Sequence, residues 1–303
     1  MPAVFRVASA PVSWGVHEPI DKGITPPYGL ILDNMVKSGY IGTELGPYGY
    51  FPTDPAKLKA ELTKRKLAML SAFVPVPLGD KARLDEAVQD AVKVGTLLQA
   101  FGCQYIVIAG SEDNPARLKK AGRVTARDSL TEEQWEVAAE GLHRVAERCL
   151  KLGLRTVLHH HVGTFFETPR EIERIMAETE PQLVGLCLDT GHYAFGGGDP
   201  VDAVKEFGSR VRYLHFKDLD EDVLAKVKKE KLDFFQAVQA GVFPALGEGC
   251  VNFPALVKEL AKLNYDGWII VEQDVLGERD TKGRTTLEMA MASRRYLEEV
   301  IGV

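Results

Sequence analysis

The chain has 303 residues, 45% of them hydrophobic, and a formal net charge of −6. This length can bury a large core, and the acidic balance disfavours general binding to nucleic acid or to a membrane surface. No apolar stretch approaches the roughly 18 residues of a membrane span, and we expect no secretory signal peptide at the N-terminus. The four widely spaced cysteines form no CxxC pair and indicate reduced, mostly buried thiols in a cytoplasmic protein.

Short β-rich runs alternate with longer helical patterns along the whole chain. The predicted strands centre on residues 4–8, 40–44, 68–74, 105–109, 156–161, 184–189, 211–215 and 268–272. Such alternation is typical of a parallel sheet, and eight units favour a single (β/α)8 TIM barrel domain over residues 1–303. A doubly wound open sheet is the alternative that the pattern leaves open.

Helix signals lie between these strands. Apolar residues recur at helical spacing over 84–98 and 137–149. A capping residue precedes a proline at 53–55 and at 168–169, which predicts helix starts. Predicted helix ends are marked by Gly39, Gly102 and Gly153.

Two long connections follow predicted strands. Residues 110–131 follow the fourth strand, and residues 218–251 follow the seventh. The second connection contains a helical stretch at 232–238 and a Gly-Glu-Gly turn at 247–249. Both leave the carboxyl ends of strands, where insertions in barrels are usually functional.

Metal-binding residue types end four of the predicted strands. These residues are His159, Asp189, His215 and Glu272. Because the carboxyl ends of parallel strands meet at one face of a barrel, we expect their side chains to converge. Two imidazoles and two carboxylates suit a divalent ion such as Mn²⁺, Co²⁺, Zn²⁺ or Fe²⁺, and no thiolate ligand is predicted.

The histidine run at 159–161 predicts two orientations. His159 and His161 lie two residues apart on a strand and therefore point the same way, with His161 nearer the barrel mouth. His160 points the other way, and we expect it to pack beneath a helix. A single histidine is most often structural, but three in a row at a strand end weaken that interpretation.

Asp189 has two interpretations. An aspartate at this position can cap the following helix. The next clear helix signal comes only at 199–200, so the sequence favours Asp189 as a free ligand.

Lys217 is predicted to share one strand face with Tyr213 and His215. A lysine that points into a barrel mouth is costly unless it meets an anion or a substrate oxygen. The alternative is a surface lysine at a fraying strand end.

Carboxylates also follow the second and last predicted strands. Glu44 has no evident metal partner in sequence, so we interpret it as a substrate-contacting or acid/base residue. Glu272 follows an apolar run and needs a partner such as a metal. Gln273 and Asp274, which come next, are predicted to be exposed.

At these residues the chain resembles the xylose isomerase-like barrel superfamily, which includes sugar epimerases and apurinic endonucleases. The sequence from Asp189 to His192 matches its Asp-Thr-x-His motif, while His215 and Glu272 match two further ligands. The resemblance covers essentially the whole chain and implies a TIM barrel with a divalent metal. In one departure, His159 stands where most members carry a glutamate, and this removes one of the two carboxylates that epimerases use as acid and base.

Four segments give a narrower resemblance, to the inosose dehydratases. They are Ala-Pro-Val-Ser-Trp-Gly at 10–15, Gly-Thr-Glu-Leu-Gly-Pro-Tyr-Gly at 42–49, Pro-Thr-Asp-Pro at 52–55 and His-His-His-Val-Gly-Thr at 159–164. The resemblance implies removal of water from 2-keto-myo-inositol (scyllo-inosose), which gives a cyclic dione in inositol catabolism. It also implies dependence on Mn²⁺ or Co²⁺, with Zn²⁺, Fe²⁺ and Mg²⁺ as other options.

Dehydration beside a ketone needs a base for the α-proton and an acid for the leaving hydroxyl. Candidate bases are Glu272 and Glu44, and candidate groups to assist the leaving hydroxyl are His161, His192 and Lys217. Predicted substrate contacts are Trp14, His17, His192 and Glu248, although Glu248 can equally be structural. The sequence leaves these roles open.

The expected partner is a small polyol or sugar, with no nucleic acid and no membrane. A homodimer or homotetramer is compatible with the chain. The alternative functions are a sugar isomerase or epimerase of the same superfamily and a non-catalytic binding protein. DNA repair is a third alternative, which the acidic balance disfavours.

Overall fold

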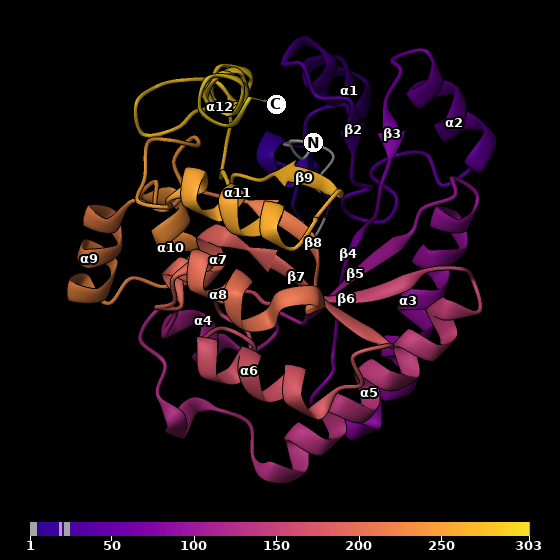
Figure 1. Ribbon diagram of the computed structural model, residues 1–303, viewed down its shortest axis with the longest axis vertical. Coiled ribbons are helices and arrows are strands. Elements are labelled where there is room, and N and C mark those ends of the chain that lie inside the picture. Colours follow the sequence, from indigo (N-terminus) through magenta and orange to yellow (C-terminus); the bar gives the residue numbers. More distant parts are fainter. Residues whose placement is uncertain (1–4, 18–19, 21–24, 303) are drawn as a thin grey trace.

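The computed structural model describes residues 5–17, 20 and 25–302, which form a curled parallel β-sheet surrounded by helices (Figure 1). Its strands are β1 (Arg6–Ser9), β2 (Gly42–Thr43), β3 (Ala68–Met69), β4 (Phe73–Val76), β5 (Tyr105–Gly110), β6 (Arg155–His159), β7 (Val184–Asp189), β8 (Val211–Phe216) and β9 (Trp268–Val271). Val4, which the sequence placed in the first strand, lies outside the described residues.

The sheet closes on itself because its two end strands, β3 and β4, follow each other directly in the chain. The strand order is β3-β2-β1-β9-β8-β7-β6-β5-β4, and the pairs are parallel. Between β3 and β4, the Leu70 amide donates to the Thr43 carbonyl, and the Ala72 carbonyl accepts from the Val107 amide. The predicted strand 68–74 therefore joins both edges, which confirms the closed barrel and excludes the doubly wound sheet.

Helices lie around the outside of the sheet (Figure 1). They are α1 (Tyr28–Lys37), α2 (Pro55–Thr63), α3 (Leu84–Gln99), α4 (Pro115–Lys119), α5 (Glu132–Leu150), α6 (Pro169–Glu178), α7 (Thr190–Phe195), α8 (Pro200–Phe207), α9 (Glu221–Glu230), α10 (Phe234–Gln239), α11 (Phe253–Lys262) and α12 (Thr286–Ile301). No helix of the described part of the chain is both long and apolar enough to cross a bilayer.

The predicted start and end signals are confirmed. Asp54 and Thr168 cap α2 and α6, and a proline is the first helical residue of each. Gly39, Gly102 and Gly153 follow α1, α3 and α5 with positive φ angles, which glycine adopts without steric cost.

Alternation along the strands separates the barrel interior from the layer beneath the helices. Val157, Cys187 and Ile270 belong to the interior cluster. Leu158 and Leu186 belong to the larger core shared with the helices. Each strand thus sends every second side chain inward, so His159 follows Val157 and Asp189 follows Cys187 on the interior face.

The two long connections cover part of the barrel mouth. Residues 110–131 contain α4, and residues 218–251 contain α9 and α10. The predicted helical stretch at 232–238 is confirmed as α10, whereas α9 was not predicted. Apolar side chains from both connections, including Ala121, Phe234 and Phe243, form a separate cluster with Phe195 of α7.

A buried ion pair fixes the first of these connections to α6. Arg117 of α4 is 2% exposed, and its guanidinium donates to both Oε atoms of Glu171, each at 3.0 Å. It also donates to the Thr164 carbonyl at 2.7 Å. Glu171 in turn accepts the Thr168 amide in the capping box of α6. One carboxylate therefore joins the connection and the helix start.

Replacing this carboxylate is expected to destabilise the fold strongly. Glu171→Gln removes the carboxylate that binds both guanidinium nitrogens of buried Arg117 and leaves only Glu167 Oε2, 4.0 Å away, to balance its charge, so the free energy of unfolding should fall by about 3 kcal/mol. The measurement is urea denaturation followed by circular dichroism. The control is Glu132→Gln, whose exposed carboxylate pairs with Arg174 and is expected to contribute less than about 1 kcal/mol. Equal losses in the two variants would contradict the role of Glu171.

Candidate functional site

The four predicted ligands converge at the carboxyl ends of three strands and just beyond a fourth. His159 and Asp189 are the last residues of β6 and β7, His215 lies in β8, and Glu272 follows β9. One potential ligand atom from each residue lies within 4.8 Å of the others. All four side chains are buried, so the cluster lies inside the barrel mouth.

The spacing within this cluster fits one shared ion. His159 Nε2 lies 3.6 Å from Asp189 Oδ2, and His215 Nδ1 lies 3.3 Å from Glu272 Oε2. His215 Nδ1 also lies 3.9 Å from Asp189 Oδ2. Nitrogen and oxygen ligands that bind one ion at about 2.0–2.2 Å are themselves roughly 3–4 Å apart.

Several atoms of the cluster lack hydrogen-bond partners. Within the described part of the chain, both ring nitrogens of His159, Asp189 Oδ2 and His215 Nδ1 accept or donate no hydrogen bond. Buried polar atoms are normally paired, and unpaired ones are costly. These converging unpaired atoms fit a bound cation, and the cluster is suited to hold a divalent metal ion.

The charge of the site also favours a cation. Asp189, Glu272 and Asp274 place three buried carboxyl groups around the Lys217 ammonium, and a fourth, that of Glu44, lies beside His215. Burial disfavours the imidazolium of His215, but the Cys187 thiol and the carboxylates of Glu272 and Glu44 hold its pKa well above the ordinary value. The Lys217 ammonium offsets only part of the charge of the four carboxylates, and a divalent ion would offset more of it.

Asp189 both caps a helix and faces the cluster, which corrects the sequence interpretation. Its Oδ1 accepts the His192 amide at 2.8 Å and caps α7, a helix that the sequence did not predict. Its Oδ2 faces His159 and Lys217. The cap was missed because α7 is short and begins directly at the strand end, without the proline that marks the starts of α2 and α6.

Lys217 lies inside the barrel and not at the surface. It is 0% exposed, and its Nζ lies 2.7 Å from Asp274 Oδ1, 3.0 Å from His192 Nε2 and 3.3 Å from Glu272 Oε2. Burial opposes its charge, but the carboxylates of Asp189, Asp274 and Glu272 raise its pKa. Lys217 therefore remains an ammonium group and can donate hydrogen bonds.

The prediction that Gln273 and Asp274 are exposed is wrong. They are 6% and 7% exposed: Gln273 Nε2 donates to the Phe243 carbonyl at 3.1 Å, and Asp274 lines the cavity. Although burial opposes ionisation, Lys217 and His192 hold the pKa of Asp274 well below its usual range. Sequence analysis missed Asp274 as a site residue. The signal was present, because two-residue alternation from Glu272 places Asp274 on the same face.

The other two histidines of the run take different positions. His160 is fully buried; its Nε2 accepts the Asp189 amide at 3.2 Å and its ring packs against Tyr193 of α7. His161 lies at the cavity wall, with Nδ1 2.8 Å from the Val162 carbonyl and 3.6 Å from Glu112 Oε1. These positions agree with the opposite orientations predicted from strand alternation.

A cavity of about 350 Å³ opens onto this cluster. Its walls include Glu44, His161, Lys217 and Asp274. Glu44 follows β2, is 1% exposed, and its Oε1 lies 3.2 Å from His215 Nε2. Glu44 is therefore next to the ligand cluster but outside the four converging ligands.

The predicted substrate contacts are only partly brought together. His17 lines the cavity, and its Nε2 lies 2.6 Å from the Val275 carbonyl. His192 and Trp14 are absent from the lining that the described residues form. His192 Nε2 contacts Lys217 Nζ at 3.0 Å. Trp14 is 1% exposed and packs in the core, where its indole N–H donates to Ser9 Oγ at 3.2 Å.

Glu248 lies in an ion-pair network away from the described cavity lining. Its Oε1 and Oε2 accept from Arg284 at 2.5 and 2.9 Å, and Oε2 also accepts from Lys282 at 2.6 Å. These bonds, led by those from Arg284, lower its pKa. Of the two interpretations of Glu248, the contacts favour the structural one.

Comparisons with known proteins identify a family, related sequences and similar folds. The sequence model of the xylose isomerase-like TIM barrel family matches residues 32–295. An inosose dehydratase of Geobacillus kaustophilus is 36% identical over 302 residues, with 98% of this chain and 95% of that protein covered. This relative is similar to the chain over nearly its full length.

Solved structures show the same fold at low sequence identity. An L-ribulose 3-epimerase has a TM-score of 0.72 and 15% identity, with 98% of this chain and 95% of that chain covered. A probable 3-DHS dehydratase involved in petrobactin synthesis in Bacillus anthracis has a TM-score of 0.69 and 16% identity, with 97% and 98% covered. The same barrel therefore carries both epimerases and dehydratases, and only the site can distinguish them.

Proposed function

The chain belongs to the xylose isomerase-like TIM barrel family and, within it, to the inosose dehydratases, and on this premise we propose that it removes water from 2-keto-myo-inositol in inositol catabolism. It is a hydro-lyase. The observation that carries the proposal is the convergence of His159, Asp189, His215 and Glu272. Two of them, His159 and Glu272, line a cavity together with Glu44, Lys217 and His161.

The four converging residues are proposed to hold the metal ion. When bound, a divalent ion polarises the ketone oxygen and so acidifies the proton on the adjacent carbon. We propose Mn²⁺ or Co²⁺, with Zn²⁺, Fe²⁺ and Mg²⁺ as other options, because two imidazoles and two carboxylates form a mixed nitrogen and oxygen donor set. The unpaired ring nitrogens of His159 and Oδ2 of Asp189 support this assignment.

Glu44 is proposed as the base. Glu272 is a member of the converging ligand set, whereas Glu44 is outside it and lines the cavity. His215 Nε2, 3.2 Å from Glu44 Oε1, holds the carboxylate in place. A carboxylate held beside the substrate cavity can take a proton from carbon.

Lys217 and His161 are proposed to act on substrate oxygens. Asp274 and His192 orient the Lys217 ammonium, which donates a hydrogen bond to a substrate oxygen. His161 lies nearer the mouth and is proposed to deliver a proton to the leaving hydroxyl. His17, which also lines the cavity, is proposed to contact the substrate.

The proposed reaction breaks one C–H bond and one C–O bond. The Glu44 carboxylate takes the proton from the carbon beside the ketone, and the electron pair of that bond forms a C=C bond. The hydroxyl on the next carbon leaves as water with the proton from His161. The resulting enol has its hydroxyl next to the ketone and rearranges to the dione.

His159 favours elimination over epimerisation. An epimerase removes a proton with one group and returns it with a second, and relatives in this superfamily use two metal-site carboxylates for this purpose. Here an imidazole with two unpaired nitrogens takes the place of one carboxylate. One carboxylate base outside the ligand set is sufficient for an elimination.

The cellular compartment, the size of the substrate and the oligomeric state are also proposals. The free thiols of the four cysteines support a reducing compartment, and we propose the cytoplasm. The cavity volume of about 350 Å³ suits a small polyol. A homodimer or homotetramer remains compatible with the chain.

The test of function is a direct assay. The protein incubated with 2-keto-myo-inositol and Mn²⁺ should produce the ultraviolet absorbance of the dione and lose that activity when the metal is chelated. Free ketohexoses should remain unchanged under the same conditions. No dione with either Mn²⁺ or Co²⁺, together with interconversion of ketohexoses, would support the isomerase or epimerase alternative instead.

Glu44→Gln should reduce kcat by about 10²- to 10⁴-fold with a much smaller change in KM, because the variant keeps the shape of the side chain but removes the base. Steady-state assays on 2-keto-myo-inositol measure both constants. Glu133→Gln, in the first turn of α5 and exposed, is the matched control and should leave both constants unchanged. A fall in kcat of less than about tenfold for Glu44→Gln would rule out Glu44 as the base.

Asp189→Asn should weaken Mn²⁺ binding by at least about a hundredfold, because the amide removes a charged ligand. Asparagine still caps α7, so the fold should be retained. Titration with Mn²⁺ followed by electron paramagnetic resonance measures the affinity. Asp199→Asn changes the equivalent cap of α8 and should bind Mn²⁺ as the unaltered chain does. Equal affinities in the two variants would remove Asp189 from the metal site.

A further inference from the structure

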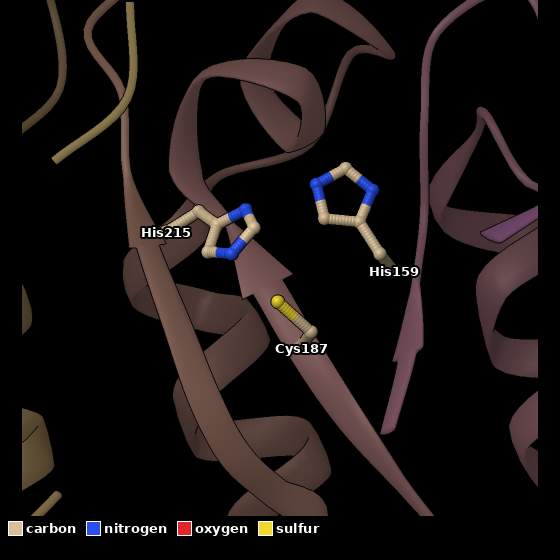
Figure 2. Close-up of side chains that lie close together, drawn as sticks. All are labelled: His159, Cys187 and His215. Atoms are coloured by element: carbon tan, nitrogen blue, oxygen red, sulfur yellow. The ribbon is translucent and has the colours of Figure 1, made fainter. Parts of the chain in front are cut away.

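Cys187 lies one step deeper in the barrel than the proposed metal ligand Asp189. The two residues are two positions apart on β7 and so share its interior face. Cys187 pairs in register with His159 of β6, and Asp189 pairs with His215 of β8. Figure 2 shows the side chains of His159, Cys187 and His215, which extend from neighbouring strands toward a common space.

These three side chains bring together two nitrogens and a sulfur. One ligand atom from each lies within 4.8 Å of the others, and all three residues are at most 1% exposed. The unpaired nitrogens of the two imidazoles point to a ligand here. Both ring nitrogens of His159 lack hydrogen-bond partners among the described residues, and so does His215 Nδ1. Buried imidazole nitrogens are normally paired, so these unpaired nitrogens fit a ligand bound beside the Cys187 thiol.

We propose that His159, Cys187 and His215 form a second donor set that binds a thiophilic divalent ion such as Zn²⁺ or Cd²⁺. Thiolate and imidazole ligands select such ions, whereas the carboxylates of Asp189 and Glu272 suit harder ones. On binding, the S–H bond of Cys187 breaks, a sulfur–metal bond forms, and the proton leaves to solvent without any oxidation.

The two donor sets exclude each other because they share His159 and His215. His215 Nε2 lies 3.2 Å from Glu44 Oε1, which leaves Nδ1 as its unpaired nitrogen. One nitrogen lone pair binds one ion at a time. A thiophilic ion in the deeper set therefore displaces the ion in the upper set. The consequence for activity, which rests on the proposed function, is inhibition by thiophilic ions at concentrations that saturate the deeper set.

Cd²⁺ and Mn²⁺ serve as the two probes. Metal-free protein is titrated with Cd²⁺, and thiolate-to-cadmium charge transfer is followed by ultraviolet absorption. In a second titration the protein first binds Mn²⁺, and electron paramagnetic resonance follows the free Mn²⁺ that Cd²⁺ releases. The variants are Cys187→Ser and Cys187→Ala, with circular dichroism to verify folding. The matched control is Cys250→Ser, because Cys250 is the exposed cysteine.

The absorption band should saturate at one Cd²⁺ per chain in Cys250→Ser and be lost in both Cys187 variants. The Cd²⁺ concentration that releases half of the Mn²⁺ should rise by about 10- to 100-fold in the Cys187 variants, while their affinity for Mn²⁺ alone stays unchanged. Asp189→Asn should keep the band, because its carboxylate is outside the deeper set.

A band that persists without Cys187 would overturn the proposal, and so would loss of Mn²⁺ affinity in folded Cys187 variants. Neither measurement includes the substrate, so an error in the proposed reaction would leave these results unaffected.

Discussion

The balance of buried charge around Lys217 is the constraint on which the site depends. An ammonium group without exposure to water is stable only beside carboxylates, and Asp189, Glu272 and Asp274 supply them within 3.5 Å. The same carboxylates leave a net negative charge that a divalent ion would offset. Lys217 therefore orders the chain beyond β9 and brings Asp274, which follows the strand, into the barrel mouth.

Parallel strand geometry explains why the Asp189 side chain both caps α7 and faces the ligand cluster. Asp189 ends β7, and its Oδ1 caps α7 while its Oδ2 faces the ligand cluster. The cap fixes the orientation of the carboxylate, so the ligand atom is held before any ion binds. Two-residue alternation places Cys187 one layer below, at the level of His159. A hard and a soft donor set thus follow from consecutive interior positions of one strand.

The fold and much of the site could be predicted from sequence because the signals are local. Capping residues before prolines, glycines after helices and short apolar runs each report on a few neighbouring residues. The strand-end positions of His159, Asp189, His215 and Glu272 were visible in the same way, because apolar strands rarely end in such residues by packing alone. The short helix α7 was missed because it begins directly at a strand end without a proline. The burial of Asp274 was missed because it depends on contacts with Lys217 and His192.

The sequence by itself determined the barrel, the order of its elements and the residue types at the strand ends, because strand and helix periodicities depend on neighbours along the chain. Only the tertiary structure decided which of these residues share an ion-sized space. It placed Glu44 beside His215, separated by 171 positions in sequence, and Trp14 in the core. It also placed Glu248 against Arg284. Such contacts follow from barrel closure, which brings distant strands together and which no local pattern encodes.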